Sequence, residues 1–169
     1  MLLLVCAAHS AGAWAVDGVS LELGQGDGAR MGRAGLQWKW DQQWFKGGQT
    51  HVGGYWDLSL GHWTRDALPG QNHRITEIGL RPTFRLQQNS GQGLYAEASV
   101  GFHLLSDTTL GPRRFGTTFQ FSEHLGVGYQ FGAKRALDIG LRYQHLSNAG
   151  IKQPNNGINI TQVRAQYWF

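Results

Sequence analysis

The chain has 169 residues, a formal net charge of +4 and 25 glycines, with 7 Trp, 5 Tyr and 8 Phe. This length suits a single domain, and no run approaches the roughly 18 consecutive apolar residues that a transmembrane helix needs. The positive charge favours an anionic surface such as phosphorylated lipid headgroups, whereas the lack of any basic run or basic helix argues against nucleic acid as a partner.

Residues 1–15 have the features of a secretory signal peptide. A short apolar stretch leads to small residues and an A-x-A-like cleavage site at residues 13–15. No Lys or Arg precedes Arg30, so we expect that a few basic residues are missing from the start of the signal. Cys6 would suit a lipoprotein signal, but its very early position favours the plain signal peptide. Cleavage leaves residues 16–169 without a cysteine, so packing or a bilayer must hold the mature chain together.

Eight segments after the signal alternate between apolar and polar residues, the period that is typical of β-strands. A tilted transmembrane strand needs about 9–11 residues, a length that all of them reach except the first, which has six. In chain order they span residues 19–24, 32–40, 50–63, 74–86, 94–105, 118–131, 137–146 and 159–169. The fifth is the clearest, because its even-numbered positions are apolar throughout and its odd-numbered ones include Glu97 and His103. The connections have turn chemistry and no helical pattern.

The polar faces of these strands indicate a membrane barrel rather than a soluble sandwich. They carry more Glu, Asp, Arg and Gln than a sandwich core tolerates, whereas a barrel presents its apolar face to lipid and encloses a polar network. The chain ends in phenylalanine, and the aromatic residues near strand ends fit an interfacial girdle: Trp40, Trp44, Phe45, Trp63, Trp168 and Phe169. We predict an all-β fold, an eight-stranded antiparallel transmembrane β-barrel of the bacterial outer membrane. Its interior is just wide enough for side chains, which argues against a general pore.

Two polar residues interrupt the apolar face of the seventh segment. If the N-terminus is periplasmic, this strand runs outward and ends near the external rim. His145 and Ser147 share the odd parity of its apolar residues Leu137, Ile139 and Leu141. Unless a bulge intervenes, both side chains lie on the outer surface, with α-carbons about 6.6–7 Å apart.

The hairpins on either side predict the neighbours of His145. A tight turn before residue 137 places Glu123 opposite His145, and the last hairpin places Asn159 opposite it on the other side. A slip of two residues in either hairpin would break this row. Glu123 also has the parity of an apolar face, where a carboxylate is costly unless it lies near the interface or is paired.

A serine, a histidine and a carboxylate at one height supply a nucleophile, a base and an orienting group. Membrane lipids would offer such a site an ester directly. Each residue also has a plainer interpretation: His145 as an interfacial side chain, Glu123 turned inward by a bulge, and residues 147–157 as an ordinary polar loop.

The segment HLSNAGIKQPNNGI, residues 145–158, is similar to the signature H-x-S-N-A-G-x-K-Q-P-N of the lipid A 3-O-deacylases, the PagL family. WKWDQQWF and GYWDLSLGHW resemble that family's second and third strands, and the likeness spans the mature chain. The resemblance implies an outer-membrane barrel that hydrolyses the 3-O ester of lipid A in lipopolysaccharide, with no metal or cofactor. It implies His145 as general base and Ser147 as nucleophile. Asn148, Gly150 and Asn155 are then candidates for stabilising the oxyanion.

The chain departs from the family at one position. A member of the family has a glutamate fourteen residues after the histidine, where this chain has Asn159, and no Asp or Glu follows Asp138. Asn159 would orient the imidazole through its amide oxygen, or Glu123 would replace the missing acid, or the activity would be reduced. We favour Glu123 as the charged partner, with Asn159 assisting. The alternatives in function are a non-catalytic barrel for adhesion or membrane integrity, and a phospholipase or acyl transferase.

Overall fold

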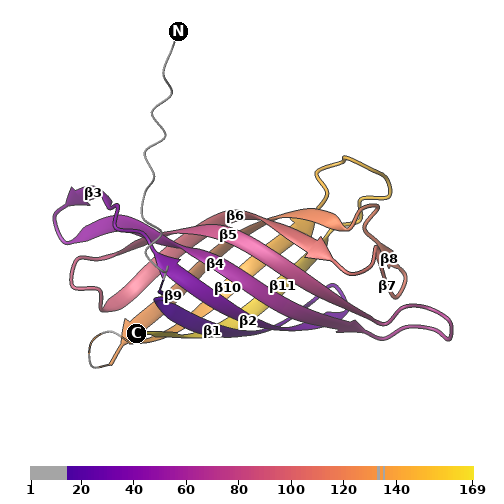
Figure 1. Ribbon diagram of the computed structural model, residues 1–169, viewed down its shortest axis with the longest axis horizontal. Helices are drawn as coiled ribbons and strands as arrows, with labels where there is room; N and C mark the ends of the chain where they lie inside the picture. Colours follow the sequence, from indigo (N-terminus) through magenta and orange to yellow (C-terminus); the bar gives the residue numbers. More distant parts are fainter. Residues whose placement is uncertain (1–14, 133, 135) are drawn as a thin grey trace, which may run out of the picture.

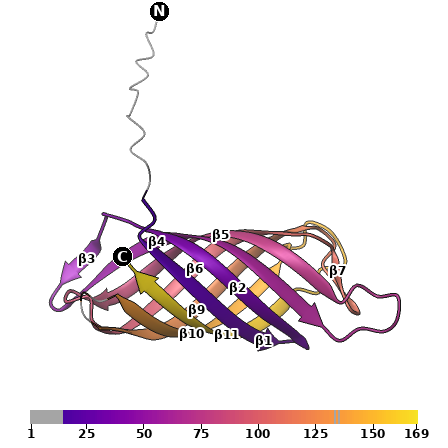
Figure 2. The ribbon, with the colours of Figure 1, turned by 60° about the horizontal axis from the view of Figure 1, so that its bottom comes forward.

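The computed structural model describes residues 15–132, 134 and 136–169, so the predicted signal peptide lies outside the described residues except for Ala15. In the described residues, eight long antiparallel strands form one closed barrel (Figure 1): β1 (Gly18–Gly26), β2 (Ala29–Lys39), β4 (Thr50–Arg65), β5 (Arg74–Gln88), β6 (Gly93–Leu105), β9 (Phe119–Phe131), β10 (Leu137–Ser147) and β11 (Ile158–Trp168). Neighbouring strands pair in chain order, and β1 pairs with β11, which closes the sheet (Figure 2). The predicted fold is confirmed. No helix in the described part of the chain is long and apolar enough to cross a membrane.

Two connections that the sequence predicts as plain turns contain short strands. β3 (Trp44–Gly47) pairs with β4, and β7 (Thr109–Leu110) forms a small hairpin with β8 (Arg113–Arg114). Strands of two to four residues are too short to show an alternating pattern. We call the end of the barrel that carries the β7–β8 hairpin and the β10–β11 loop the outer end; β3 and the C-terminus lie at the opposite end (Figure 1).

The alternation along each strand separates an exposed apolar wall from a polar interior. On β10, for example, Ile139 and Tyr143 are exposed, whereas Asp138 and Arg142 are buried. The predicted interfacial position is wrong for two residues of the girdle, because their side chains are buried: Trp63 is 1% exposed and Trp168 is 4% exposed. Both have the parity of inward-facing residues, so their place near a strand end does not bring them to the lipid face.

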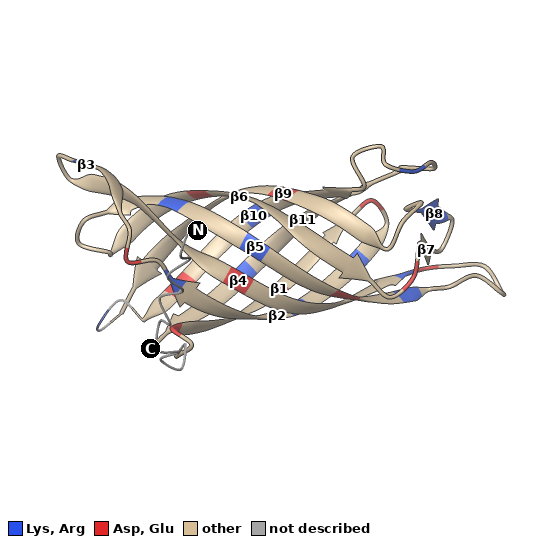
Figure 3. Ribbon diagram, turned by 45° about the horizontal axis from the view of Figure 1, so that its top comes forward, with Lys and Arg blue, Asp and Glu red and all other residues tan. Residues whose placement is uncertain are grey.

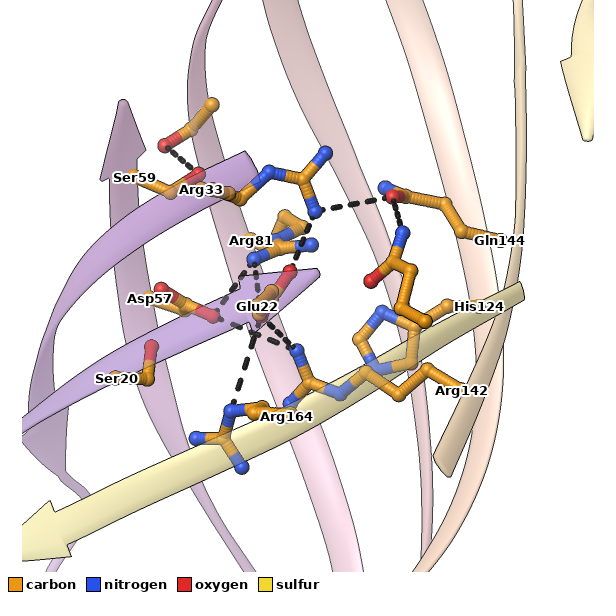
Figure 4. Close-up of polar contacts among 12 residues, drawn as sticks. Ser20, Glu22, Arg33, Asp57, Ser59, Arg81, His124, Arg142, Gln144 and Arg164 are labelled. Atoms are coloured by element: carbon orange, nitrogen blue, oxygen red, sulfur yellow. Dashed lines mark hydrogen bonds and ion pairs between the residues drawn. The ribbon is translucent and has the colours of Figure 1, made fainter. Parts of the chain in front are cut away.

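Positions of Lys, Arg, Asp and Glu lie on strands through the middle of the barrel (Figure 3), and many of these charged residues are buried. Glu22 is the centre of one cluster (Figure 4), where its carboxylate contacts Arg33 at 2.7 Å, Arg142 at 2.6 Å and Arg81 at 3.3 Å. Asp57 in turn accepts from Arg81 at 2.8 Å. Because these buried charges are paired, they can lie in the barrel interior without water around them. The interior of an eight-stranded barrel is filled by side chains of this kind and leaves no room for a channel.

Glu22→Gln is expected to destabilise the barrel by about 3–5 kcal/mol, because four buried guanidinium groups lose the negative charge of a carboxylate that they contact. The free energy of unfolding should be measured by urea titration in detergent micelles, with tryptophan fluorescence as the probe. Asp41→Asn, at an exposed carboxylate in the β2–β3 connection, is the matched control. A loss no larger than that of the control would contradict a stabilising role for the cluster.

An apolar cluster fills the interior at the outer end. It consists of Ala29, Met31, Trp63, Ile75, Leu105, Leu110, Phe115, Leu146, Ile158 and Ile160. Leu110 and Phe115 come from the β7–β8 region, while Leu146, Ile158 and Ile160 belong to the outer ends of β10 and β11. The backbone of these two strand ends is therefore anchored from inside, which leaves the residues between the buried ones facing outward at fixed positions.

Candidate active site

His145 and Ser147 lie on the outer wall of the barrel at the outer end of β10. The pairing of β10 with β9 runs without interruption from Leu137 to Ser147, so no bulge reverses the alternation. Leu146 and Asn148 are buried, whereas His145 and Ser147 are partly exposed on the opposite face. The predicted outward orientation of both side chains is confirmed.

The predicted row across three strands is also present. His145 pairs with Glu123 on β9 and with Asn159 on β11. The contacts within the row are unequal, however. The His145 Nδ1 atom lies 2.8 Å from Asn159 Oδ1, which is hydrogen-bond distance. Glu123 is exposed and forms no hydrogen bond or ion pair with any of the described residues. The group that contacts the imidazole is therefore the asparagine, and the stronger role expected for Glu123 has no contact to support it.

The imidazole of His145 lies against a glycine. A Cβ atom added to Gly157 would stand 2.8 Å from His145 Cε1 and 3.3 Å from Nε2, and this residue has a φ of 53°. A side chain at position 157 would therefore displace the ring. Ser147 Oγ accepts a weak hydrogen bond from the Ala149 backbone N–H at 3.5 Å, and no hydrogen bond joins it to the His145 ring in the described structure.

The β10–β11 loop is held by Asn148, which is fully buried. Its Nδ2 donates to the backbone oxygens of Phe115 and Lys152, each at 2.7 Å, and its Oδ1 accepts from Gly150 N at 2.9 Å. Its own backbone N–H donates to Asn155 Oδ1 at 3.0 Å. Of the three oxyanion candidates, Asn148 and Gly150 thus already use their N–H groups in hydrogen bonds that hold the loop. The Nδ2 atom of Asn155 has no partner among the described residues.

An apolar groove of about 560 Å³ begins beside the row and crosses the outer wall from β10 to β5. His145 and Glu123 line it together with Tyr143, Leu125 and Phe84, and the small side chain of Ala98 deepens it. Because the groove lies on the surface that would face lipid, it is a place where an acyl chain can lie next to the imidazole.

Two residues that sequence reasoning missed reach the site from other elements. Asp27, in the β1–β2 turn, accepts a hydrogen bond from the side chain of Asn159, and Arg113 of β8 donates to the backbone oxygen of Asn156 at 3.1 Å. An Asp-Gly pair between two strands does signal a tight hairpin. Nothing in the sequence indicates that this hairpin would end beside Asn159, because that depends on how β1 and β11 close the barrel.

The comparisons with known proteins agree with this architecture. A family model described as lipid A 3-O-deacylase (PagL) matches residues 30–168. The lipid A deacylase PagL of Bordetella bronchiseptica is 34% identical over 159 residues, which cover 90% of this chain and 83% of that protein. The lipid A deacylase PagL of Pseudomonas aeruginosa is 31% identical over 161 residues, which cover 94% and 89%.

A solved structure gives the same result for the whole barrel. The crystal structure of the outer membrane enzyme PagL matches with a TM-score of 0.80 at 27% identity, over 90% of this chain and 99% of that one. The resemblance carried by residues 145–158 and the predicted outer-membrane location are therefore confirmed. The chain belongs to the lipid A 3-O-deacylase (PagL) family of outer-membrane enzymes.

Proposed function

We propose that this protein is an outer-membrane serine esterase that hydrolyses the ester-linked acyl chain at the 3-position of lipid A. The observation that carries the proposal is the outward-facing pair of His145 and Ser147, with the imidazole held at Nδ1 by Asn159. The names of the two curated relatives, both lipid A deacylases, support the substrate class. The groove beside His145 supports an acyl chain as the part of the substrate that binds there.

The chemistry follows from the roles of the two residues. Ser147 Oγ attacks the ester carbonyl carbon, and Nε2 of His145 takes the hydroxyl proton. The bond between that carbon and the 3-oxygen of the sugar then breaks, and the proton on Nε2 passes to the departing oxygen. Water, activated by the same nitrogen, hydrolyses the acyl-serine ester, which releases the fatty acid and restores Ser147. The scheme uses no metal or cofactor.

Ser147 needs a small rearrangement to begin this reaction. It is two residues from His145 on one strand face, so their α-carbons are about 6.6–7 Å apart. Rotation about the serine Cα–Cβ bond turns Oγ away from Ala149 N and toward the ring. Catalytic hydrogen bonds are often long or absent without substrate and tighten when it binds.

Asn155 is the best placed of the three oxyanion candidates, since its Nδ2 is available to a ligand. We assign Asn148 and Gly150 to holding the loop around it, and Ala149 N, beside Ser147 Oγ, as a second donor. Removal of one such donor typically costs about 10²–10³ in rate.

We assign the orientation of the imidazole to Asn159 in preference to Glu123. An asparagine oxygen takes this role in papain-like proteases, where it holds a catalytic histidine by the nitrogen that does not exchange the proton. Glu123, which lines the groove on the other side of His145, is better placed to meet the substrate than to hold the ring.

The test is mass spectrometry of lipid A from cells that express the protein and from cells with the empty vector. We expect a new lipid A species that lacks one hydroxyacyl chain and carries a free 3-hydroxyl group. Lysophospholipids without any change in lipid A would assign the activity to a phospholipase. Unchanged lipids, with the barrel verified in the outer membrane, would favour the non-catalytic alternative of adhesion or membrane integrity.

A further inference from the structure

The tight turn between β1 and β2 lies against the active-site row. Gly26 and Ala29 are paired, so the turn consists of Asp27 and Gly28 alone, with φ values of 48° and 78°. Positive φ at both positions is the type I′ geometry that Asp-Gly favours. Closure of the barrel by β1 and β11 brings this turn to Asn159, and a Cβ at Gly26 would collide with the Asn159 backbone oxygen. The close approach therefore requires glycine at position 26.

Asp27 makes two hydrogen bonds to Asn159. Its Oδ2 accepts from the backbone N–H of Asn159 at 2.9 Å and from the side-chain Nδ2 at 3.1 Å. The same oxygen lies 3.5 Å from Arg113 Nη2, and Arg65 donates to the Asp27 backbone oxygen. Burial lowers the pKa of Arg113, and the Asp27 carboxylate opposes that shift. The carboxylate is thus held in place by its neighbours on both sides.

These contacts determine the direction of every hydrogen bond up to the imidazole. An ionised carboxylate only accepts hydrogen bonds, so the Asn159 amide must turn its NH₂ group toward Asp27. Its oxygen then faces His145 Nδ1, which must carry a hydrogen to donate. A neutral imidazole with a hydrogen on Nδ1 has its lone pair on Nε2, which is the atom that a general base needs.

We propose that Asp27 is a positioning residue for deacylation, which sets the tautomer of His145 through Asn159 and supplies the negative charge that the family's glutamate would supply directly. The inference rests on the proposed function. When Nε2 takes the serine proton, the positive charge on the ring is stabilised by an amide dipole that Asp27 both aligns and polarises. Asp27 touches neither the substrate nor the reacting atoms.

The experiment is a double-mutant cycle of Asp27→Asn and Asn159→Glu, with purified barrels in mixed micelles of lipid A and detergent. Asparagine tolerates the turn geometry at position 27, so the hairpin is preserved. In the chain with Asn159 we expect Asp27→Asn to lower kcat about 10–100-fold with little change in KM, the loss that is typical when a group that holds a metal-bound histidine from its outer side is replaced. In the Asn159→Glu chain a carboxylate contacts His145 directly, so Asp27→Asn should cause no further loss.

Asp66→Asn is the matched control, because Asp66 lies in another connection of the outer end and its side chain is fully exposed. Equal losses from Asp27→Asn in both backgrounds would mean that Asp27 only holds the turn, and this would overturn the proposal. A rise in KM without a fall in kcat would also overturn it. So would an unchanged kcat for Asp27→Asn in the chain that keeps Asn159. Failure of the proposed function itself is distinguishable, since in that case the chain without substitutions releases no fatty acid from lipid A.

Discussion

Replacing Ser147 with alanine is expected to reduce the rate of acyl-chain release from lipid A by at least about 10³-fold, because removal of the nucleophile leaves only binding and oxyanion stabilisation. The substitution deletes one oxygen from a partly exposed side chain whose only hydrogen bond among the described residues is the 3.5 Å contact from Ala149 N. The barrel should therefore fold as before. The measurement is fatty acid released per mole of purified protein in mixed micelles.

Ser90→Ala provides the control, since Ser90 is an exposed serine in the β5–β6 turn at the opposite end of the barrel. It should leave the rate unchanged. If Ser147→Ala kept a tenth or more of the activity, the covalent scheme would be refuted, and a water molecule activated by His145 would be the remaining nucleophile.

Replacing His145 with glutamine is expected to cause a loss comparable with that of Ser147→Ala, because the serine hydroxyl is a weak nucleophile without a base. Glutamine retains a polar side chain of similar size at the membrane surface. The sharper expectation concerns the double variant Ser147→Ala with His145→Gln, which should be no slower than either single variant. Residues that act as one unit give such non-additive losses.

His62→Gln is the matched control for this substitution, because His62 is likewise a histidine on the outward face of a barrel strand. Its activity should equal that of the unmodified chain. Losses that multiply in the double variant would show that His145 and Ser147 contribute to separate steps, and that His145 is not the base for this serine.

The eight long strands are predictable from the sequence because each presents a wall of apolar residues to lipid, and few structures besides a β-strand give period-two alternation over nine or more residues. The β3 strand and the β7–β8 hairpin are not, since two to four residues carry no period. The error over Trp63 and Trp168 has a different origin. Their place near strand ends suggests the interface, but parity decides the face, and Trp63 fills the apolar cluster at the outer end.

The row of Glu123, His145 and Asn159 is also predictable, because short turns and matched strand ends restrict the register of a hairpin. The contacts within the row are not. Opposed residues have the same Cβ spacing whether or not their polar atoms meet, so the sequence alone does not distinguish Glu123 from Asn159 as the partner of the imidazole. The contact between Asp27 and Asn159 is even harder to predict, because the two residues are 132 positions apart and meet only when the barrel closes.

The outward orientation of Ser147 and His145 determines how the proposed active site meets a lipid. A molecule anchored in the same leaflet reaches the barrel wall by lateral diffusion in two dimensions. The quantity that sets the encounter rate is therefore the surface density of the lipid around the barrel, not its molarity in the surrounding water. Dilution of the substrate with inert amphiphiles in the leaflet slows turnover even when its total amount stays constant. The effective substrate concentration is therefore the fraction of substrate among the lipids that contact β9, β10 and β11.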